Sequence, residues 1–187
     1  DADADVTTGE YDSEELKSYE LGAKTNWNVL SGMTANAAVF YYEYTDQQIG
    51  VQVDNGGFTT TQTVNAGETD IYGLDMDARM QFTQQFSLSL GYVYTNAEFD
   101  DFNLAEIGGT GQQSANNLAL AGNAEADFSG NTTPLSSEHS ATLALRYEDQ
   151  LTDDISGFGE IFGIYQSKRY IDAGNRAYLP SYDIWNV

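Results

Sequence analysis

The strongest pattern in this chain is a strict alternation of apolar and polar residues over residues 72–94. Successive side chains of a β-strand point to opposite faces, so this period predicts two strands that are each apolar on one face. A fold about Gln84 places Met80 opposite Leu88 and predicts an antiparallel hairpin with one apolar and one polar face. The apolar rows are Tyr72, Leu74, Met76, Ala78, Met80 and Phe82, then Phe86, Leu88, Leu90, Tyr92 and Tyr94.

The same alternation predicts further strands on both sides of this hairpin. Residues 18–44 form a hairpin when Trp27 lies opposite Met33, and a third hairpin begins near His139 and turns at 148–154. Its returning strand, 155–170, has one row rich in glycine and another that contains Glu160. The sequence therefore leaves open which row of that strand joins the apolar face. Residues 181–187 predict the start of another strand.

The connections between these strands alternate in length. Short turns are predicted at 28–32, 83–85 and 148–154, long acidic loops at 46–68 and 100–136, and an intermediate one near 171–180. This asymmetry is typical of outer-membrane barrels, which have short periplasmic turns and long extracellular loops. Aromatic residues lie where interfacial girdles are expected: Tyr19, Trp27, Tyr41, Tyr72, Phe82, Phe86, Tyr92 and Tyr94. The pattern predicts an all-β, antiparallel, up-and-down transmembrane barrel whose apolar face contacts lipid.

A soluble β-sandwich is the alternative, with the apolar face turned into a core. Predicted strands of about 14 residues exceed the usual length in soluble sheets and favour the membrane barrel.

Composition narrows the chemistry that the chain can perform. In 187 residues, seven Lys and Arg face 29 Asp and Glu, for a net charge of −22, which argues against a nucleic-acid partner. There is no cysteine and one histidine, His139, for which we expect a structural or interfacial role. Asp1, Asp3 and Asp5 match a calcium loop only in part, and Gly108–Gly111 lacks the flanking elements of a phosphate loop. We expect no enzyme activity, no metal site and no cofactor.

Charged residues gather on the predicted polar face. Asp75, Asp77 and Arg79 share that face at i, i+2 and i+4. Glu20, Lys24 and Arg146 occupy equivalent positions on other strands. In a barrel these six side chains line the lumen. Two interpretations stay open for them, a lattice of ion pairs that keeps the lumen polar and a direct contact with a substrate.

Seven short segments resemble, in the right order, motifs of the TonB-dependent outer-membrane receptors. Asp75 stands where that family usually has Glu. The segments are 11–25 (YDSEELKSYELGAKT), 38–42 (AVFYY), 65–75 (NAGETDIYGLD), 92–99 (YVYTNAEF), Pro134 with His139, 145–147 (LRY) and 170–182 (YIDAGNRAYLPSY).

The resemblance implies that residues 1–187 are part of a larger barrel. That barrel would have about 22 strands and a plugged lumen. About six or seven strands would lie in this chain, while the plug domain and the terminal strands would be absent. We then expect the bacterial outer membrane as location, with the membrane lipid, the receptor's own plug domain and the TonB protein as partners. A segment with two unpaired sheet edges is not expected to be stable alone.

The resemblance also implies active import of a scarce small-molecule ligand, in most of the family a ferric siderophore or other iron complex. A passive porin-like or adhesive barrel is the alternative.

Overall fold

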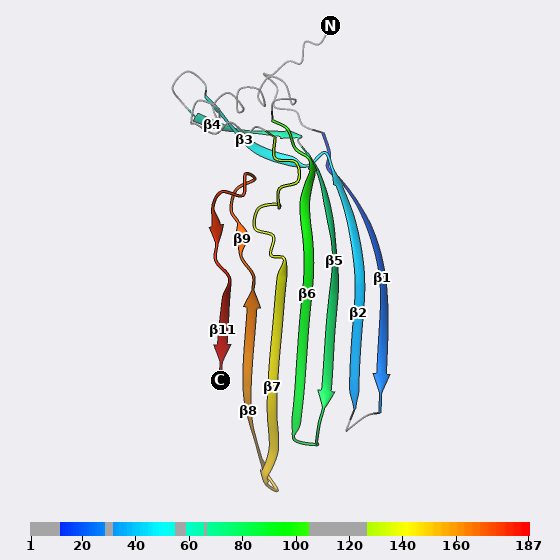
Figure 1. The fold of residues 1–187 in the computed structure, drawn as a ribbon. Coiled ribbons are helices and arrows are strands. Elements are labelled where there is room, and N and C mark those ends of the chain that lie inside the picture. The colour runs from blue at the N-terminus through cyan, green and yellow to red at the C-terminus, as the bar shows by residue number, and fades with distance from the viewer. Residues whose placement is uncertain (1–11, 29–31, 55–58, 66, 105–126) are drawn as a thin grey trace.

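A computed structural model describes residues 12–28, 32–54, 59–65, 67–104 and 127–187. Its main element is a seven-stranded sheet in the order β1-β2-β5-β6-β7-β8-β11, in which every neighbouring pair is antiparallel. Figure 1 shows these strands side by side in one curved layer. The fold is all-β, as the sequence predicts, and the barrel is not closed within this chain. The strands are β1 Glu15–Trp27, β2 Met33–Thr45, β5 Glu68–Gln81, β6 Phe86–Asp101, β7 His139–Thr152, β8 Ile155–Gln166 and β11 Tyr182–Asn186.

The register of the predicted hairpins is confirmed. Met80 lies opposite Leu88 in the β5–β6 pair, and Trp27 lies opposite Met33 in the β1–β2 pair. Across the sheet, residues in register share a face, so the apolar rows of successive strands join into one surface. The turn between β5 and β6 is closed by a hydrogen bond in which the Phe82 N–H donates to the Phe86 carbonyl over 2.9 Å.

The structure decides the orientation of β8, which the alternation left open. Ile161 lies opposite Leu145 on the apolar face, whereas Glu160 lies opposite Arg146 on the polar face. The glycine-rich row thus belongs to the apolar face. Gly163 in this row leaves room for the Trp185 ring of β11, since a Cβ on Gly163 would lie 2.5 Å from that ring.

Three predicted connections contain more strand than the sequence indicated. The turn predicted at 148–154 is wrong in extent, because β7 continues to Thr152 and β8 begins at Ile155. Main-chain pairing continues past Glu148 to Thr152, although most side chains there are polar and exposed. The predicted loop 46–68 contains a hairpin of β3 Gln48–Asp54 and β4 Thr59–Asn65. The region after β8 contains the small pair β9 Arg169–Tyr170 and β10 Tyr178–Leu179.

A small hydrophobic core lies at the end of the sheet that carries the long connections, here called the long-loop end. The Phe102 ring contacts Phe99 and Phe128 with centroid distances of 4.8 and 5.3 Å, and Ala97 and Leu104 are buried beside them. The rest of the sheet is a single layer with large apolar side chains exposed, among them Leu21 and Val39. Within the described residues, no helix is long and apolar enough to cross a membrane.

Candidate functional site

The polar face of the sheet carries all six charged residues that the sequence singled out. Lys24, Asn36 and Asp77 lie in one cross-strand row, because Lys24 pairs with Asn36 and Asn36 with Asp77. Arg146 lies opposite Ser87 and Glu160 toward the short-turn end. The side chains therefore share one face, as the alternation predicts. The six are Glu20, Lys24, Asp75, Asp77, Arg79 and Arg146.

These six charged residues differ in how many ionic or hydrogen-bonded partners they have. The Arg146 guanidinium contacts Glu148 at 2.9 Å and Glu160 at 3.8 Å, and lies 4.0 Å from the centre of the Phe158 ring. The Asn36 amide donates to both carboxylate oxygens of Asp77, at 3.0 and 2.9 Å. Among the residues that the structure describes, none of the other five forms an ion pair within 4.0 Å. Among the described residues, the ion pairs of these six side chains are thus confined to the surroundings of Arg146.

Three hollows follow one another along the polar face. The one nearest the long-loop end, here called the central hollow, has a volume of about 240 Å³. A hollow of about 590 Å³ lies beside Arg79 and Ser89, and one of about 380 Å³ lies beside Arg146 at the short-turn end. On this face the central hollow is lined by Asp75, Asp77, Gly91, Val93, Ser140, Thr142, Ile164, Gln166 and Tyr182.

The sequence did not single out the apolar side chains on the polar face of β8 and β11. Phe162 and Ile164 point to this face because they lie in register with Ala144 and Thr142. Tyr182 lies opposite Gln166, and its hydroxyl donates to the side-chain oxygen Oε1 of Gln166 over 2.7 Å. The alternation could have revealed them once Glu160 was assigned to the polar face, since the same row continues through 162 and 164.

The aromatic residues proposed as girdles lie on the apolar face, at different depths. Tyr19, Tyr41 and Tyr72 form one row at the long-loop end, where the Tyr41 hydroxyl donates to Asp70 over 2.8 Å. Tyr92 lies opposite Met76, nearer the middle of the strands. At the short-turn end the Phe86 ring lies 4.7 Å from that of Tyr147.

His139 begins β7 on the apolar face. Its Nδ1 is 2.9 Å from the Tyr92 hydroxyl, and its ring lies 5.5 Å from that of Tyr94. The backbone of His139 is tied to Ser167, since the His139 N–H donates to the Ser167 hydroxyl and the Ser167 N–H donates to the His139 carbonyl, both over 2.9 Å. These contacts join β7 to the end of β8.

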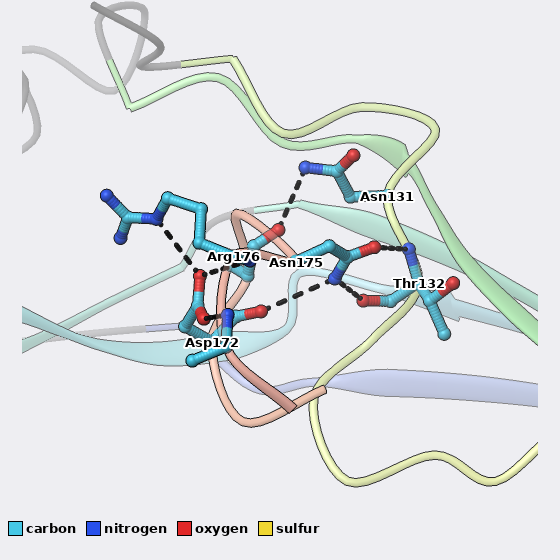
Figure 2. A network of polar contacts seen from close by, with 7 residues as sticks. Asn131, Thr132, Asp172, Asn175 and Arg176 are labelled. Atoms are coloured by element: carbon cyan, nitrogen blue, oxygen red, sulfur yellow. Dashed lines mark hydrogen bonds and ion pairs between the residues drawn. The ribbon is translucent and has the colours of Figure 1, made fainter. Parts of the chain in front are cut away.

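A network of side-chain amides joins two loops at the long-loop end (Figure 2). The Asn175 amide nitrogen donates to the Thr132 carbonyl over 2.8 Å, and the Thr132 N–H donates to the Asn175 side-chain oxygen over 2.9 Å. The Asn131 amide donates to the Ala173 carbonyl over 2.9 Å. The Asn175 side chain thus both donates to and accepts from the Thr132 backbone, as a paired strand residue would. These hydrogen bonds hold segment 127–136 against segment 171–177.

Asp172 orders the second of these loops from within. Its carboxylate accepts hydrogen bonds from the Ala177 N–H at 2.9 Å and from the Arg176 guanidinium at 3.3 Å. Partial burial by itself raises the pKa of Asp172, but the hydrogen bonds from Ala177 and Arg176 outweigh it and hold that pKa below its usual value. At neutral pH the residue is a charged anchor of the loop.

The described residues contain no group of three or more His, Asp or Glu arranged to hold a metal ion. Two motifs weighed in the sequence, Asp1–Asp5 and Gly108–Gly111, lie outside the described residues.

A family model described as the β-barrel of TonB-dependent receptor-like proteins matches residues 1–187, the whole chain. The chain belongs to the TonB-dependent receptor β-barrel family. This confirms the resemblance seen in the sequence and assigns the open sheet to a barrel wall. The family is one of receptors and transporters.

Two relatives of this TonB-dependent receptor barrel carry names that state a function. The chain is 29% identical over 175 residues to a probable TonB-dependent siderophore receptor, PiuA, of Acinetobacter baumannii, covering 91% of this chain and 20% of the relative. It is 26% identical over 156 residues to the ferrioxamine receptor of Yersinia enterocolitica, covering 82% of this chain and 17% of the relative. The chain thus spans about a fifth of the length of these relatives.

Solved structures of receptors of this kind have the same fold. The ferric yersiniabactin uptake receptor FyuA of Yersinia pestis matches with a TM-score of 0.64 at 18% identity, over 94% of this chain and 22% of that one. The siderophore receptor PiuA of Acinetobacter baumannii matches with a TM-score of 0.60 at 25% identity, over 94% of this chain and 22% of that one. The copper transporter OprC matches with a TM-score of 0.61 at 13% identity, over 92% of this chain and 22% of that one. The fold is therefore shared among proteins whose names state different cargoes.

Proposed function

We propose that this chain is one sector of the wall of an outer-membrane receptor that imports a ferric siderophore with energy from the TonB system. The observation that carries the proposal is the family match over the whole chain, joined to two relatives whose names state siderophore or ferrioxamine reception. The remaining parts of the receptor would include a plug domain inside the barrel and further strands beyond β1 and β11.

In this proposal the apolar face contacts the lipid of the outer membrane. The central cross-strand row of that face contains Ala78, Leu90 and Leu143, with no charged side chain. The tyrosine row at the long-loop end would lie at the outer headgroups, and Phe82, Phe86 and Trp27 at the inner ones. Consequently the polar face, with its charged residues and hollows, would line the lumen through which cargo passes.

A pair of neighbouring residues tests this assignment of the faces. Leu143 and Thr142 are consecutive on β7, at mid-strand, and point to opposite faces. In the full-length receptor, Leu143→Arg would place a charge in lipid at a cost of about 2–4 kcal/mol, whereas Thr142→Arg would face water. We expect loss of the folded, heat-modifiable band on electrophoresis for Leu143→Arg only. Equal assembly of the two variants would contradict the assignment.

Uptake measurements test the transport itself. The full-length gene is deleted in its host, and uptake of ⁵⁵Fe presented as a ferric siderophore is compared with that of the complemented strain under iron limitation. We expect uptake to require the gene, TonB and the proton-motive force. Uptake that continues after a protonophore or after deletion of TonB would support a passive pore instead.

A further inference from the structure

Arg169 is a half-buried cation at the long-loop end of the sheet. It lies in β9, opposite Leu179 of β10. Its Nε is shielded from solvent and has no hydrogen-bond partner among the residues that the structure describes. Its guanidinium carbon lies 5.7 Å from the centre of the Tyr182 ring. The side chain is thus held against an aromatic ring while one of its donors is left unsatisfied.

The other six Lys and Arg residues of the chain either have a polar partner or are exposed to water. Lys24 and Arg79 form no ion pair among the described residues, but both are exposed and therefore hydrated. The remaining four have a carboxylate or hydroxyl partner: Lys17, Arg146, Lys168 and Arg176. Within the described part of the chain, Arg169 alone combines a shielded guanidinium nitrogen with the lack of an acidic partner.

A shielded guanidinium needs an acceptor, because the water that hydrates it in the unfolded chain is excluded in the folded one. At 5.7 Å the Tyr182 ring attracts the cation without satisfying that donor. Although the chain contains 29 Asp and Glu, no carboxylate of the described residues lies within 4.0 Å of the Arg169 nitrogens. The acceptor must then come from outside the described residues.

Tyr182 shows on which side of the wall Arg169 lies. It lies opposite Gln166, which points to the polar face, and its hydroxyl is fixed by the Gln166 side-chain oxygen at 2.7 Å. The guanidinium over this ring therefore lies at the long-loop edge of the polar face. In the proposed receptor that face surrounds the lumen, so a group within the lumen can approach Arg169.

We propose that Arg169 forms an ion pair with a carboxylate of the plug domain, through Nε and one terminal nitrogen of the guanidinium. This inference rests on the proposed function, which places a plug domain inside the barrel. The two N–H groups on that edge of an arginine match the two oxygens of a carboxylate, and such a contact would satisfy the shielded Nε. Arg169 would then join the plug to the wall at the long-loop end of the lumen.

A resident carboxylate fits Arg169 better than an anionic group on the cargo. A cargo occupies the lumen for only part of the time, and the shielded cation would be unpaired for the rest. A plug carboxylate is present throughout. Relatives of this chain also have enough sequence to supply it, since the chain spans about a fifth of the length of two of them.

Carbodiimide cross-linking of the full-length receptor tests the pairing. Arg169→Lys supplies a primary amine at this position. The carbodiimide converts a nearby carboxylate to an O-acylisourea, the amine attacks its carbonyl carbon, an amide forms and the urea leaves. We expect peptide mass spectrometry to find position 169 linked to an Asp or Glu of the plug domain. Arg169→Gln, which has no amine, is the matched control, and the Lys17–Glu43 pair at 3.3 Å is the positive control for the reaction.

Two results of the cross-linking would overturn the proposal. One is a link from position 169 to a loop of the barrel, residues 105–126 included. The other is no link at position 169 in a sample in which Lys17 and Glu43 are joined. Either result leaves the transport function standing, whereas a full-length sequence without a plug domain would overturn both.

Protease protection of the plug measures what the pair contributes. We expect Arg169→Gln to accelerate cleavage of the plug about tenfold in the assembled receptor, while the heat-modifiable barrel band is retained. Arg79→Gln, which removes an exposed arginine of the same face, should change that rate by less than about twofold. Arg169→Glu, combined with arginine in place of the linked acidic residue, should restore the wild-type rate. An unchanged cleavage rate in Arg169→Gln would overturn the pairing, and weaker binding of anionic but not neutral ferric complexes in that variant would assign the guanidinium to the cargo instead.

Discussion

Asn175 is predicted to hold together the two loops at the long-loop end. Its side chain exchanges two hydrogen bonds with the Thr132 backbone, at 2.8 and 2.9 Å, in a part-buried position. Asn175 also has a φ of 52°, in the left-handed region that asparagine tolerates better than alanine. Asn175→Ala therefore removes two hydrogen bonds and adds backbone strain.

The expected magnitude follows from these two effects. Each hydrogen bond contributes about 1 kcal/mol, and alanine in the left-handed region costs about 1 kcal/mol more. We expect the free energy of local opening to fall by about 3 kcal/mol in Asn175→Ala and by about 2 kcal/mol in Asn175→Gly, which has no left-handed strain. The glycine variant thus separates the loss of hydrogen bonds from the loss of backbone preference.

Hydrogen–deuterium exchange of the Thr132 amide in the full-length receptor measures this opening directly. A change of about 2 kcal/mol corresponds to roughly thirtyfold faster exchange, and 3 kcal/mol to more than a hundredfold. The amide of Leu90, at the centre of the sheet, should exchange at an unchanged rate. Unchanged exchange at Thr132 in both variants would refute the reasoning, because it would mean that Asn175 does not hold segment 127–136.

Two further predictions concern the loop anchor and the sheet. The pKa of Asp172 is held below its ordinary 3.8 in the folded loop, so its contribution to loop stability is complete above that value and lost as pH falls through the lower folded pKa. The protection factor of the Ala177 amide, which corrects for the intrinsic pH dependence of exchange, should therefore fall only in that acidic range, and Asp172→Asn should lower it already at pH 7. Gly73→Ala should prevent assembly, because a Cβ there would overlap the Tyr94 carbonyl oxygen and lie 2.5 Å from the Phe40 ring. Gly159→Ala, where no atom lies within 4 Å of the new Cβ, is the matched control, and equal heat-modifiability of the two variants would contradict the packing argument.

Much of the wall could be predicted because alternation is a local property. A strand with a period of two fixes both its faces once its register is known, and the apolar rows allow one register for each hairpin. Trp27 opposite Met33 and Met80 opposite Leu88 therefore followed from the sequence. The six charged residues of the polar face followed from the same reasoning, whereas their pairing did not. Among the described residues, Arg146 is the only one of the six with acidic side chains within ion-pair distance, and its contact with Glu160 depends on which strand lies beside β7.

The structure of the long connections could not be predicted from local sequence patterns. The hairpin of β3 and β4 has few large apolar side chains, and the sequence indicated only an acidic loop. The amide network of Asn175 joins residues 43 positions apart, and no periodicity marks such a contact. Its geometry arises because β7 and β8 bring the two loops to the same end of the sheet (Figure 1).

The sequence by itself determined that the chain forms long antiparallel strands with one apolar and one polar face, since side-chain alternation along a strand needs no knowledge of its neighbours. Tertiary structure alone decided which row of β8 joins each face and which residues surround each hollow. It brought Asp75 and Asp77 of β5 into the lining of one hollow with Ile164 and Tyr182, which come 87 to 107 residues later in the chain. These residues lie together because of the order of the strands, and strand order is a property of the whole sheet.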